Sequence, residues 1–310
     1  MKIALISDIH GNIDALEAVL KDAQVQGVEG YAFLGDYIFD MPFANDVVRR
    51  IRALPNATFI SGNKEALLDR LAGEDQSTWT HNQVGVIYQT YRELSEADRN
   101  WLRALPDELT VTLPSGRRLY CAHYLPGCRR EGETMYDSSI VFDRQNTPVR
   151  IDHAQYNRGL ERFYNESMYS LISSIDADII AYGHNHLQGY GRCAGRLVID
   201  AGSCGLPMDH DTRAAYTILD DGAELGVIER RVEYDIESAI ERARTASICR
   251  ASEDWSRLTF YLVRTACDRV GRLFEIAQEI ADGKGETGGL FENDTLHEAM
   301  ERLAAETPGM

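Results

Sequence analysis

Short apolar segments alternate with segments of helical period over the first sixty residues, and this alternation constrains the fold more than any other feature. Residues 3–6 and 31–34 are apolar, residues 58–60 are Thr-Phe-Ile, and residues 14–24 and 45–54 between them carry apolar side chains at helical spacing. Strands that follow one another through helices at this spacing pair in parallel through right-handed crossovers. The amino-terminal part of the chain is therefore predicted to be an α/β fold.

The middle of the chain continues this mixed pattern. Residues 65–105 are predicted to be helical, and residues 160–175 have the period of one helix. Residues 124–155 lack a clear period, which is typical of a long functional loop or cap. We expect the strands late in the chain to form a second sheet. Strands are predicted at 110–113 and 118–122, as a hairpin, and at 179–182, 196–199, 214–219 and 225–232.

After Tyr234 only helical patterns remain, and one apolar stripe runs from Trp255 to Ile280 as if along a single long helix. We therefore divide the chain into a domain of residues 1–233 and a helical C-terminal extension of residues 234–310. The stripe leaves two roles open, because the extension could join a second copy in a homo-oligomer or cover the domain.

The charge balance is acidic, with 32 Lys and Arg against 49 Asp and Glu and a formal net charge of −17. Such a field repels duplex nucleic acid and acidic lipid surfaces, so we expect neither as a partner. No run approaches the roughly 18 apolar residues of a membrane span, and we expect no signal peptide. The six cysteines are scattered without a Cys-x-x-Cys pair, which favours free thiols and a cytoplasmic location.

Five short segments rich in metal-ligating side chains each follow a predicted strand directly. Asp8 and Asp36 are 28 residues apart, and Asp36 and Asn63 are 27 apart, each about one strand–helix unit. Loops at the carboxyl ends of strands gather at one edge of an α/β sheet, so we expect these segments to line one cleft. They are Asp8-Ile-His10, Gly35-Asp36, Gly62-Asn63, His123 and Gly183-His184-Asn185-His186.

The donors in these segments are too many for one ion. Their imidazole and oxygen atoms suit manganese, iron, zinc or nickel better than calcium. If Asp36 bridges, each of two ions has about four protein ligands and open positions for water. Two divalent ions roughly 3.5–4 Å apart lower the pKa of a shared water and hold the oxygens of an in-line displacement at phosphorus. The implied reaction is phosphoester hydrolysis, and the candidate metal ligands are Asp8, His10, Asp36, Asn63, His123, His184 and His186.

In this order the five segments resemble those of the calcineurin-like metallophosphoesterase superfamily. The resemblance covers about residues 1–232 and is closest to the compact bacterial phosphodiesterase-like branch. In that branch Asp-Ile-His-Gly-Asn opens the chain, and a Gly-Ser segment, here Gly202-Ser203, follows the last histidines. The resemblance implies a four-layer α/β/β/α sandwich with two metal ions, to which the helices after Tyr234 would be an extension.

The resemblance also assigns roles to single residues. Asp36 would bridge both ions, and Asp36, Asn63 and His123, together with Lys64, are the residues that we expect to act in catalysis. Glycines beside the ions would let the backbone bend tightly; they are Gly11, Gly35, Gly62 and Gly183. The first ion would be held by Asp8, His10 and His186, and the second by Asn63, His123 and His184.

Lys64 departs from the family pattern, in which a histidine usually follows Gly-Asn. That histidine faces the substrate and is thought to protonate the leaving group or steady the phosphoryl oxygens. A lysine supplies positive charge but is a poor general acid at neutral pH, so we expect slow catalysis or dependence on a good leaving group. The sequence 35–41 also lacks the Gly-Asp-x-Val-Asp-Arg-Gly string of the protein phosphatases, which disfavours that activity.

Two hypotheses for the function remain. The first is a phosphoesterase, more specifically a phosphodiesterase, in which a metal-bridging hydroxide attacks a small phosphorylated or nucleotide substrate. The second is a catalytically weakened metal-binding module that binds a phosphorylated ligand or a protein partner. Arg129 and Arg130 could clamp a phosphate or form a solvated pair on a loop.

Overall fold

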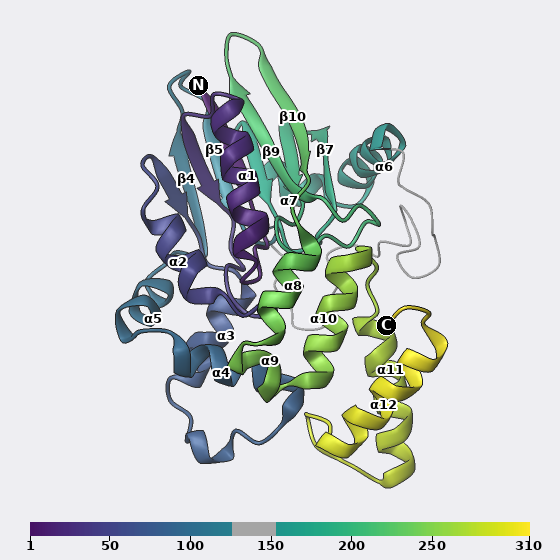
Figure 1. Ribbon diagram of the computed structural model, residues 1–310. Helices are drawn as coiled ribbons and strands as arrows, with labels where there is room; N and C mark the ends of the chain where they lie inside the picture. Colours follow the sequence, from purple (N-terminus) through teal and green to yellow (C-terminus); the bar gives the residue numbers. More distant parts are fainter. Residues whose placement is uncertain (126–152) are drawn as a thin grey trace.

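The computed structural model describes residues 1–125 and 153–310, and in this part of the chain two five-stranded sheets pack on each other (Figure 1). The first sheet has the order β10-β9-β1-β2-β3, and the second has the order β4-β5-β6-β8-β7. The strands are β1 (Lys2–Ile6), β2 (Gly30–Phe33), β3 (Ala57–Phe59), β4 (Glu108–Thr112), β5 (Arg118–Ala122), β6 (Ile179–Tyr182), β7 (Gln188–Cys193), β8 (Arg196–Ala201), β9 (Ala214–Asp221) and β10 (Leu225–Val232).

The alternation of side chains along β1 and β6 explains the layers. Successive residues of a strand point to opposite faces of its sheet. Ile3 of β1 and Ile179 of β6 belong to one buried cluster between the two sheets. Ala4 instead faces the cluster formed with α1 (Ile13–Val25) and α2 (Ala44–Arg52). Ile180 faces the cluster formed with α6 (His153–Glu166) and α7 (Tyr169–Ser174). The predicted four-layer α/β/β/α sandwich is thus confirmed.

Strand pairing confirms one prediction and corrects another. β1, β2 and β3 pair in parallel, as the alternating pattern predicts. The prediction of a second sheet late in the chain is confirmed for β6 and β8. It is wrong for the last two strands, because β9 pairs antiparallel with β1 and carries β10 into the first sheet. The second sheet begins instead with the β4–β5 hairpin. It also contains β7, a strand with two glycines that was not predicted.

Two of the predicted helices are interrupted. Residues 160–175 fall in α6 and α7 rather than in one helix. The stripe from Trp255 to Ile280 falls in α10 (Glu253–Thr265) and α11 (Val270–Lys284). α10 ends because Ala266 takes a left-handed conformation with φ of 50°. The regular helix therefore stops at Thr265, and α11 begins at Val270.

The remaining helices lie on the first sheet's side and in the extension. α8 (Ile236–Arg244) follows β10, so the predicted boundary at 233/234 falls in the turn between them. The extension shares a buried cluster with Met41 and Leu206 of the sandwich. The other helices are α3 (Asn63–Leu71), α4 (Gly85–Glu93), α5 (Glu96–Arg103), α9 (Ser247–Ala251) and α12 (Asn293–Glu306), with short 3₁₀ turns at Gln76–Thr78 and Asn82–Val84. Among the described residues no helix combines the length and apolar character needed to cross a membrane.

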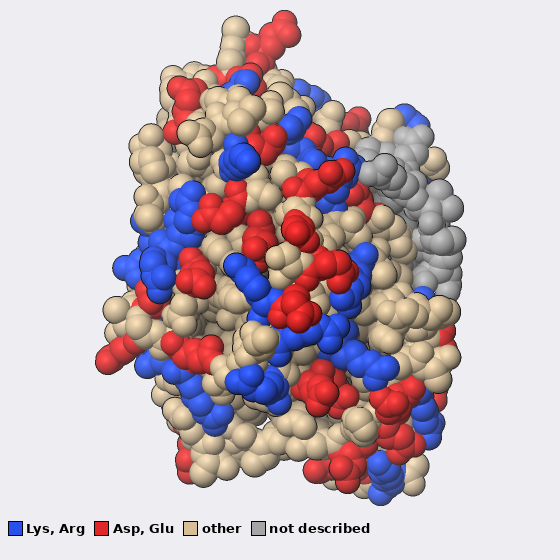
Figure 2. Space-filling model, viewed as in Figure 1, with Lys and Arg blue, Asp and Glu red and all other residues tan. Residues whose placement is uncertain are grey.

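Charged side chains of both signs are interspersed on the face seen in Figure 2. The structure pairs arginines with carboxylates of neighbouring helices. Arg242 of α8 lies 2.5 Å from Asp14 of α1, and Arg264 of α10 lies 2.6 Å from Glu237 of α8. The acidic excess of the sequence is therefore not gathered into a single field on this face.

Candidate metal centre

The predicted ligand segments follow strands of both sheets and meet at one end of the sandwich. Asp8 follows β1, Asp36 follows β2, and Asn63 begins α3 after β3. His123 follows β5, and the last histidines follow β6. Backbone hydrogen bonds join the loops, since the N–H of Asp8 donates to Gly35 and the N–H of Gly183 donates to His123. Each sheet therefore contributes part of one site.

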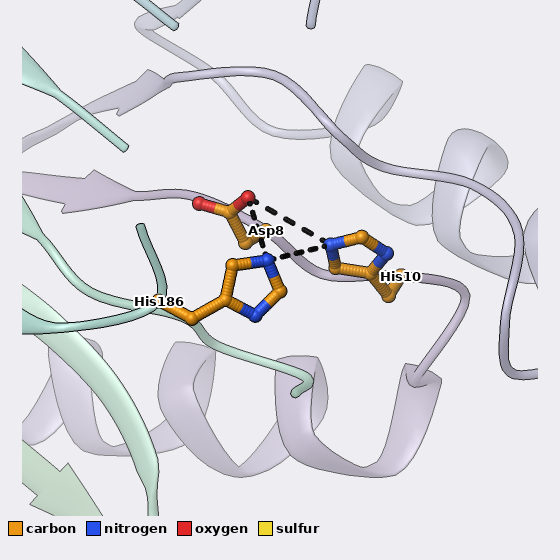
Figure 3. A group of neighbouring side chains, drawn as sticks. All are labelled: Asp8, His10 and His186. Carbon is orange, nitrogen blue, oxygen red and sulfur yellow. Dashed lines mark hydrogen bonds and ion pairs between the residues drawn. The ribbon is translucent and has the colours of Figure 1, made fainter. Parts of the chain in front are cut away.

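Three of the predicted ligands converge in a first group, shown in Figure 3. Nε2 of His10 lies 3.2 Å from Nε2 of His186. Oδ1 of Asp8 lies 3.3 Å from Nε2 of His186 and 3.7 Å from Nε2 of His10. All three side chains are buried, and Oδ1 of Asp8 receives no hydrogen bond from the described residues. A buried, unsatisfied carboxylate oxygen beside two ring nitrogens is the donor set of a cation site.

The hydrogen bonds on the far side of each ring decide what the facing nitrogens can do. Nδ1 of His186 lies 2.5 Å from the carbonyl oxygen of Leu206, so this nitrogen must donate. Nδ1 of His10 lies 2.6 Å from Oδ2 of Asp40, which likewise accepts. In the neutral rings both Nε2 atoms then carry lone pairs that point at each other. Either a proton or a metal cation has to lie between them, and the donor set fits the metal.

In the metal-free protein a proton takes this position. Burial disfavours the charged ring of His10, but the hydrogen bond to Asp40 and the nearby carboxylates of Asp8 and Asp36 outweigh it and raise the pKa of His10 to about 10. Burial also opposes the charge of Asp40, yet His10 lowers the pKa of Asp40 to about 2. The pair is therefore ionised at neutral pH, and a divalent cation has to displace the proton.

A second group forms around His123. Its Nδ1 lies 2.7 Å from the carbonyl oxygen of Leu34 and donates to it. Its Nε2 faces Oδ1 of Asn63 at 3.0 Å and Oδ2 of Asp36 at 3.5 Å. Burial disfavours the charged ring, but Asp36 outweighs it and raises the pKa of His123 to about 9. As in the first group, acceptor atoms surround a position where positive charge is favoured.

Asp36 converges with Asp8 and His123 in the second group, so Asp8 is common to both groups, and Asp36 also faces His10 of the first. Its Oδ2 is 3.5 Å from Nε2 of His123 and 3.8 Å from Nε2 of His10. Its Oδ1 accepts from the N–H of Lys64 at 2.9 Å, which fixes the carboxylate. Of the two carboxylate oxygens of Asp36, only Oδ2 faces both histidines. A ligand that bridges two ions would need this position.

His184 is placed differently from the other predicted ligands. Its backbone N–H donates to Oδ2 of Asp8 at 2.9 Å. Its ring packs 5.2 Å from the ring of His123 and 4.3 Å from that of Tyr124, measured between centroids. The structure thus brings His184 beside the second group without including it among the converging ligand atoms of the described residues.

The loops hold their ligands in an uncommon backbone conformation. Left-handed φ angles cost non-glycine residues roughly 1–2 kcal/mol each, and such strain gathers at functional sites. The loop after β2 is joined to the loop after β1, because the N–H of His10 donates to the carbonyl of Asp36 and the N–H of Met41 donates to the carbonyl of His10. The positive values belong to Asp8 (53°), His10 (49°), Asp36 (54°), Asp40 (60°), His184 (74°) and His186 (59°).

Two glycines give the loops room. A Cβ on Gly62 would lie 2.2 Å from Oδ1 of Asp36, and a Cβ on Gly183 would lie 1.9 Å from Oγ of Ser7 and 2.6 Å from Oδ2 of Asp8. A side chain at either position would therefore displace a candidate ligand or its support.

The sequence did not reveal three residues that support the ligands. Asp40 orients His10, and Nε1 of Trp255 donates to Oδ1 of Asp40 at 2.9 Å. Glu65 accepts from the N–H groups of Asp36, Tyr37 and Gly62, each at 2.9 Å. Burial and the charge of Asp36 outweigh these bonds and raise the pKa of Glu65 to about 7. An acid two positions after Asn63 was a usable signal for Glu65, whereas Trp255 matched only an apolar stripe.

Lys64 keeps its charge at the edge of the site. Burial disfavours the ammonium group, but the carboxylates of Asp36, Asp40 and Asp8 outweigh it and raise the pKa of Lys64. The side chain therefore provides positive charge and not a proton near neutral pH. Arg129 and Arg130 lie outside the described residues.

The fold and these ligand groups define a class: a four-layer α/β/β/α protein with metal-ligating side chains at its strand ends. The family model of the calcineurin-like phosphoesterase superfamily domain matches residues 1–222. The chain belongs to this superfamily.

Individual relatives agree with this placement. An uncharacterized protein of Methanocaldococcus jannaschii is 26% identical over 243 residues, which cover 77% of this chain and 90% of the relative. The crystal structure of a metallophosphoesterase from Sphaerobacter thermophilus has a TM-score of 0.61 at 22% identity, covering 86% of this chain and 100% of that one. A hypothetical protein from Pyrococcus horikoshii has a TM-score of 0.59 at 17% identity, covering 83% and 97%. At these identities the two structures are evidence of the fold.

Proposed function

We propose that the protein is a dinuclear metal-dependent phosphoester hydrolase, and more specifically a phosphodiesterase that acts on a small phosphorylated or nucleotide substrate. The observation that supports it is the position of Asp36, whose Oδ2 faces His10 of one ligand group and His123 of the other. Membership of a phosphoesterase superfamily gives the reaction class. Manganese, iron, zinc or nickel fits the mixed imidazole and carboxylate donors.

In such a reaction some residues would hold the metal ions and Lys64 would stabilise negative charge. Asp8, His10 and His186 would hold one ion, and Asp36, Asn63 and His123 the other, with His184 adjacent to it. When bound, two divalent ions supply a water of lowered pKa and neutralise charge that develops on phosphoryl oxygens. Lys64 adds a fixed positive charge beside His10, where phosphoryl oxygens would lie.

The direct test is hydrolysis of bis-p-nitrophenyl phosphate by purified protein with added manganese. Asp36→Asn should reduce turnover to background, because the variant removes the shared carboxylate. Asp46→Asn is the matched control, since Asp46 lies on α2 with a half-exposed side chain paired with Arg49. Wild-type turnover no greater than background, or equal turnover in the two variants, would contradict the proposal.

One observation favours a second candidate function, a metal-binding module that binds a phosphorylated ligand or a protein partner. Lys64 stands where the family has histidine, and its raised pKa leaves it unable to protonate a leaving group at neutral pH. Lys64→His separates the two functions. A large gain in turnover from a near-zero wild-type value supports the binding module, whereas easily measured wild-type turnover supports the enzyme.

We also propose a cytoplasmic location. Its support is the state of the described cysteines, which are free and buried at Cys121, Cys193, Cys204, Cys249 and Cys267.

A further inference from the structure

A cavity of about 380 Å³ opens beside the first ligand group. His10, Asp40, Lys64 and His186 line the end at the candidate metal centre. The cavity extends from there toward the helical extension, which lies at one end of the two sheets (Figure 1). Its volume lies within the range of small-molecule sites, roughly 300–1,000 Å³.

The walls away from the ligands are mainly apolar and come from two parts of the chain. The ring of Trp255 stacks on the ring of Phe274 with centroids 6.2 Å apart and planes 25° apart. The extension contributes Trp255, Leu258, Leu262, Val270 and Phe274. The sandwich and its connecting segments contribute Phe39, Val84, Val86, Ile87, Leu206 and Met208.

The aromatic wall is tied directly to a candidate metal ligand. Nε1 of Trp255 donates to Oδ1 of Asp40 at 2.9 Å, and Oδ2 of Asp40 lies 2.6 Å from Nδ1 of His10. One carboxylate therefore fixes the position of the wall relative to the metal centre. A phosphoryl group bound at the ligands would carry its organic substituent into the cavity.

The charges around the cavity restrict that substituent. Lys64 is the only lysine or arginine among the described residues that line it, and it stands at the ligand end. Asp40 and Asp268 add negative charge, and Oδ1 of Asp268 accepts from the N–H of Val270 at 2.9 Å. A second phosphate or a carboxylate would meet no positive charge in the apolar part, so an anionic substituent is disfavoured.

We propose that this cavity is the substrate-selecting subsite and that it binds an uncharged aryl group esterified to the phosphoryl group at the metal centre. This inference rests on the proposed function and adds the substrate class, phosphodiesters in which one of the two substituents is a compact aryl group. Val270 of the extension and Val84 of the sandwich side, which both line the cavity, then act as specificity-determining residues.

The experiment compares methylphosphonate with phenylphosphonate, two non-hydrolysable ligands that share the phosphonate group. Isothermal titration calorimetry on the manganese-loaded, full-length protein measures both affinities at a pH where both ligands are dianions. Transfer of a phenyl ring into an apolar cavity should make phenylphosphonate bind at least about tenfold more tightly. Val270→Trp should bring the ratio of the two affinities close to one, because the indole would fill the cavity.

Val84→Trp fills the same cavity from the sandwich side and serves if Val270→Trp does not fold. Val25→Trp is the matched control, because Val25 is 76% exposed at the end of α1 and should keep the wild-type ratio. Methylphosphonate binding with no preference for phenylphosphonate would overturn the cavity proposal alone. Binding of neither ligand would overturn the metal centre as a phosphoryl site, and the cavity proposal with it.

Discussion

Replacing Asp40 by asparagine tests whether the carboxylate between α10 and His10 organises the metal centre. The wild-type side chain accepts from Nδ1 of His10 at 2.6 Å and from Nε1 of Trp255 at 2.9 Å. An asparagine amide has one oxygen, so its NH₂ group must face one of these two donors. The variant keeps the shape of the side chain but cannot satisfy both neighbours.

The size of the effect follows from the pKa of Asp40. Burial opposes ionisation, but His10 lowers this pKa from 3.8 to about 2, so the folded protein favours the carboxylate. At 1.36 kcal/mol per pH unit, the loss is roughly 2 kcal/mol of unfolding free energy at pH 7. Because the folded-state pKa is lowered, this contribution is present above pH 3.8 and is lost as the pH falls through about 2.

Urea unfolding of the metal-free protein at pH 7, followed by circular dichroism, measures this difference. Manganese titration by calorimetry should show an affinity about 10–100-fold weaker than wild type, since an orienting partner of a ligand histidine is lost. Asp46→Asn serves as control, because its exposed pair with Arg49 contributes less than about 1 kcal/mol. If Asp40→Asn matches this control in both measurements, Asp40 does not orient His10.

Three further predictions concern the same site. The pKa values of about 10 for His10 and about 9 for His123 mean that both rings are protonated in the metal-free protein at pH 7. Manganese affinity measured by calorimetry should therefore rise with pH up to about 10, and protons should be released on binding. A flat profile would contradict this. Gly62→Ala should lower the unfolding free energy by more than about 2 kcal/mol in urea titrations, because its Cβ would overlap Asp36. Gly73→Ala is the control and should have little effect, because there is open space around its Cβ. Similar effects of the two substitutions would refute the steric argument. Trp255→Phe keeps an aromatic wall but loses the hydrogen bond to Asp40, so manganese should bind several-fold more weakly in calorimetry. Unchanged affinity would mean that the extension does not influence metal binding.

The sequence was sufficient to predict that the five segments meet at one site, because their signal is local. Each polar segment follows an apolar strand, and the carboxyl ends of parallel strands meet at one edge of a sheet. The first sheet's parallel core, β1 to β3, was predicted for the same reason. The outer layers were expected only from the family resemblance, and the alternation of side chains along each strand explains them in the structure.

Other features depend on contacts between distant parts of the chain. β9 pairs with β1 across about two hundred residues, so the pattern of β9 alone could not assign it to the first sheet. The break after α10 depends on one left-handed residue, Ala266, in an otherwise regular apolar stripe. Trp255 donates to Asp40 from 215 residues away, and no spacing rule predicts such a pair.

The tie between Trp255 and Asp40 has a consequence for the order in which the protein is made. During synthesis every candidate ligand has left the ribosome before α10 is complete, so a nascent sandwich could bind cations while one side of its cavity is still missing. Under the proposed function, chains released early would carry metal-loaded centres open to water and would not discriminate between esters. Selectivity would then be a property that the molecule acquires last.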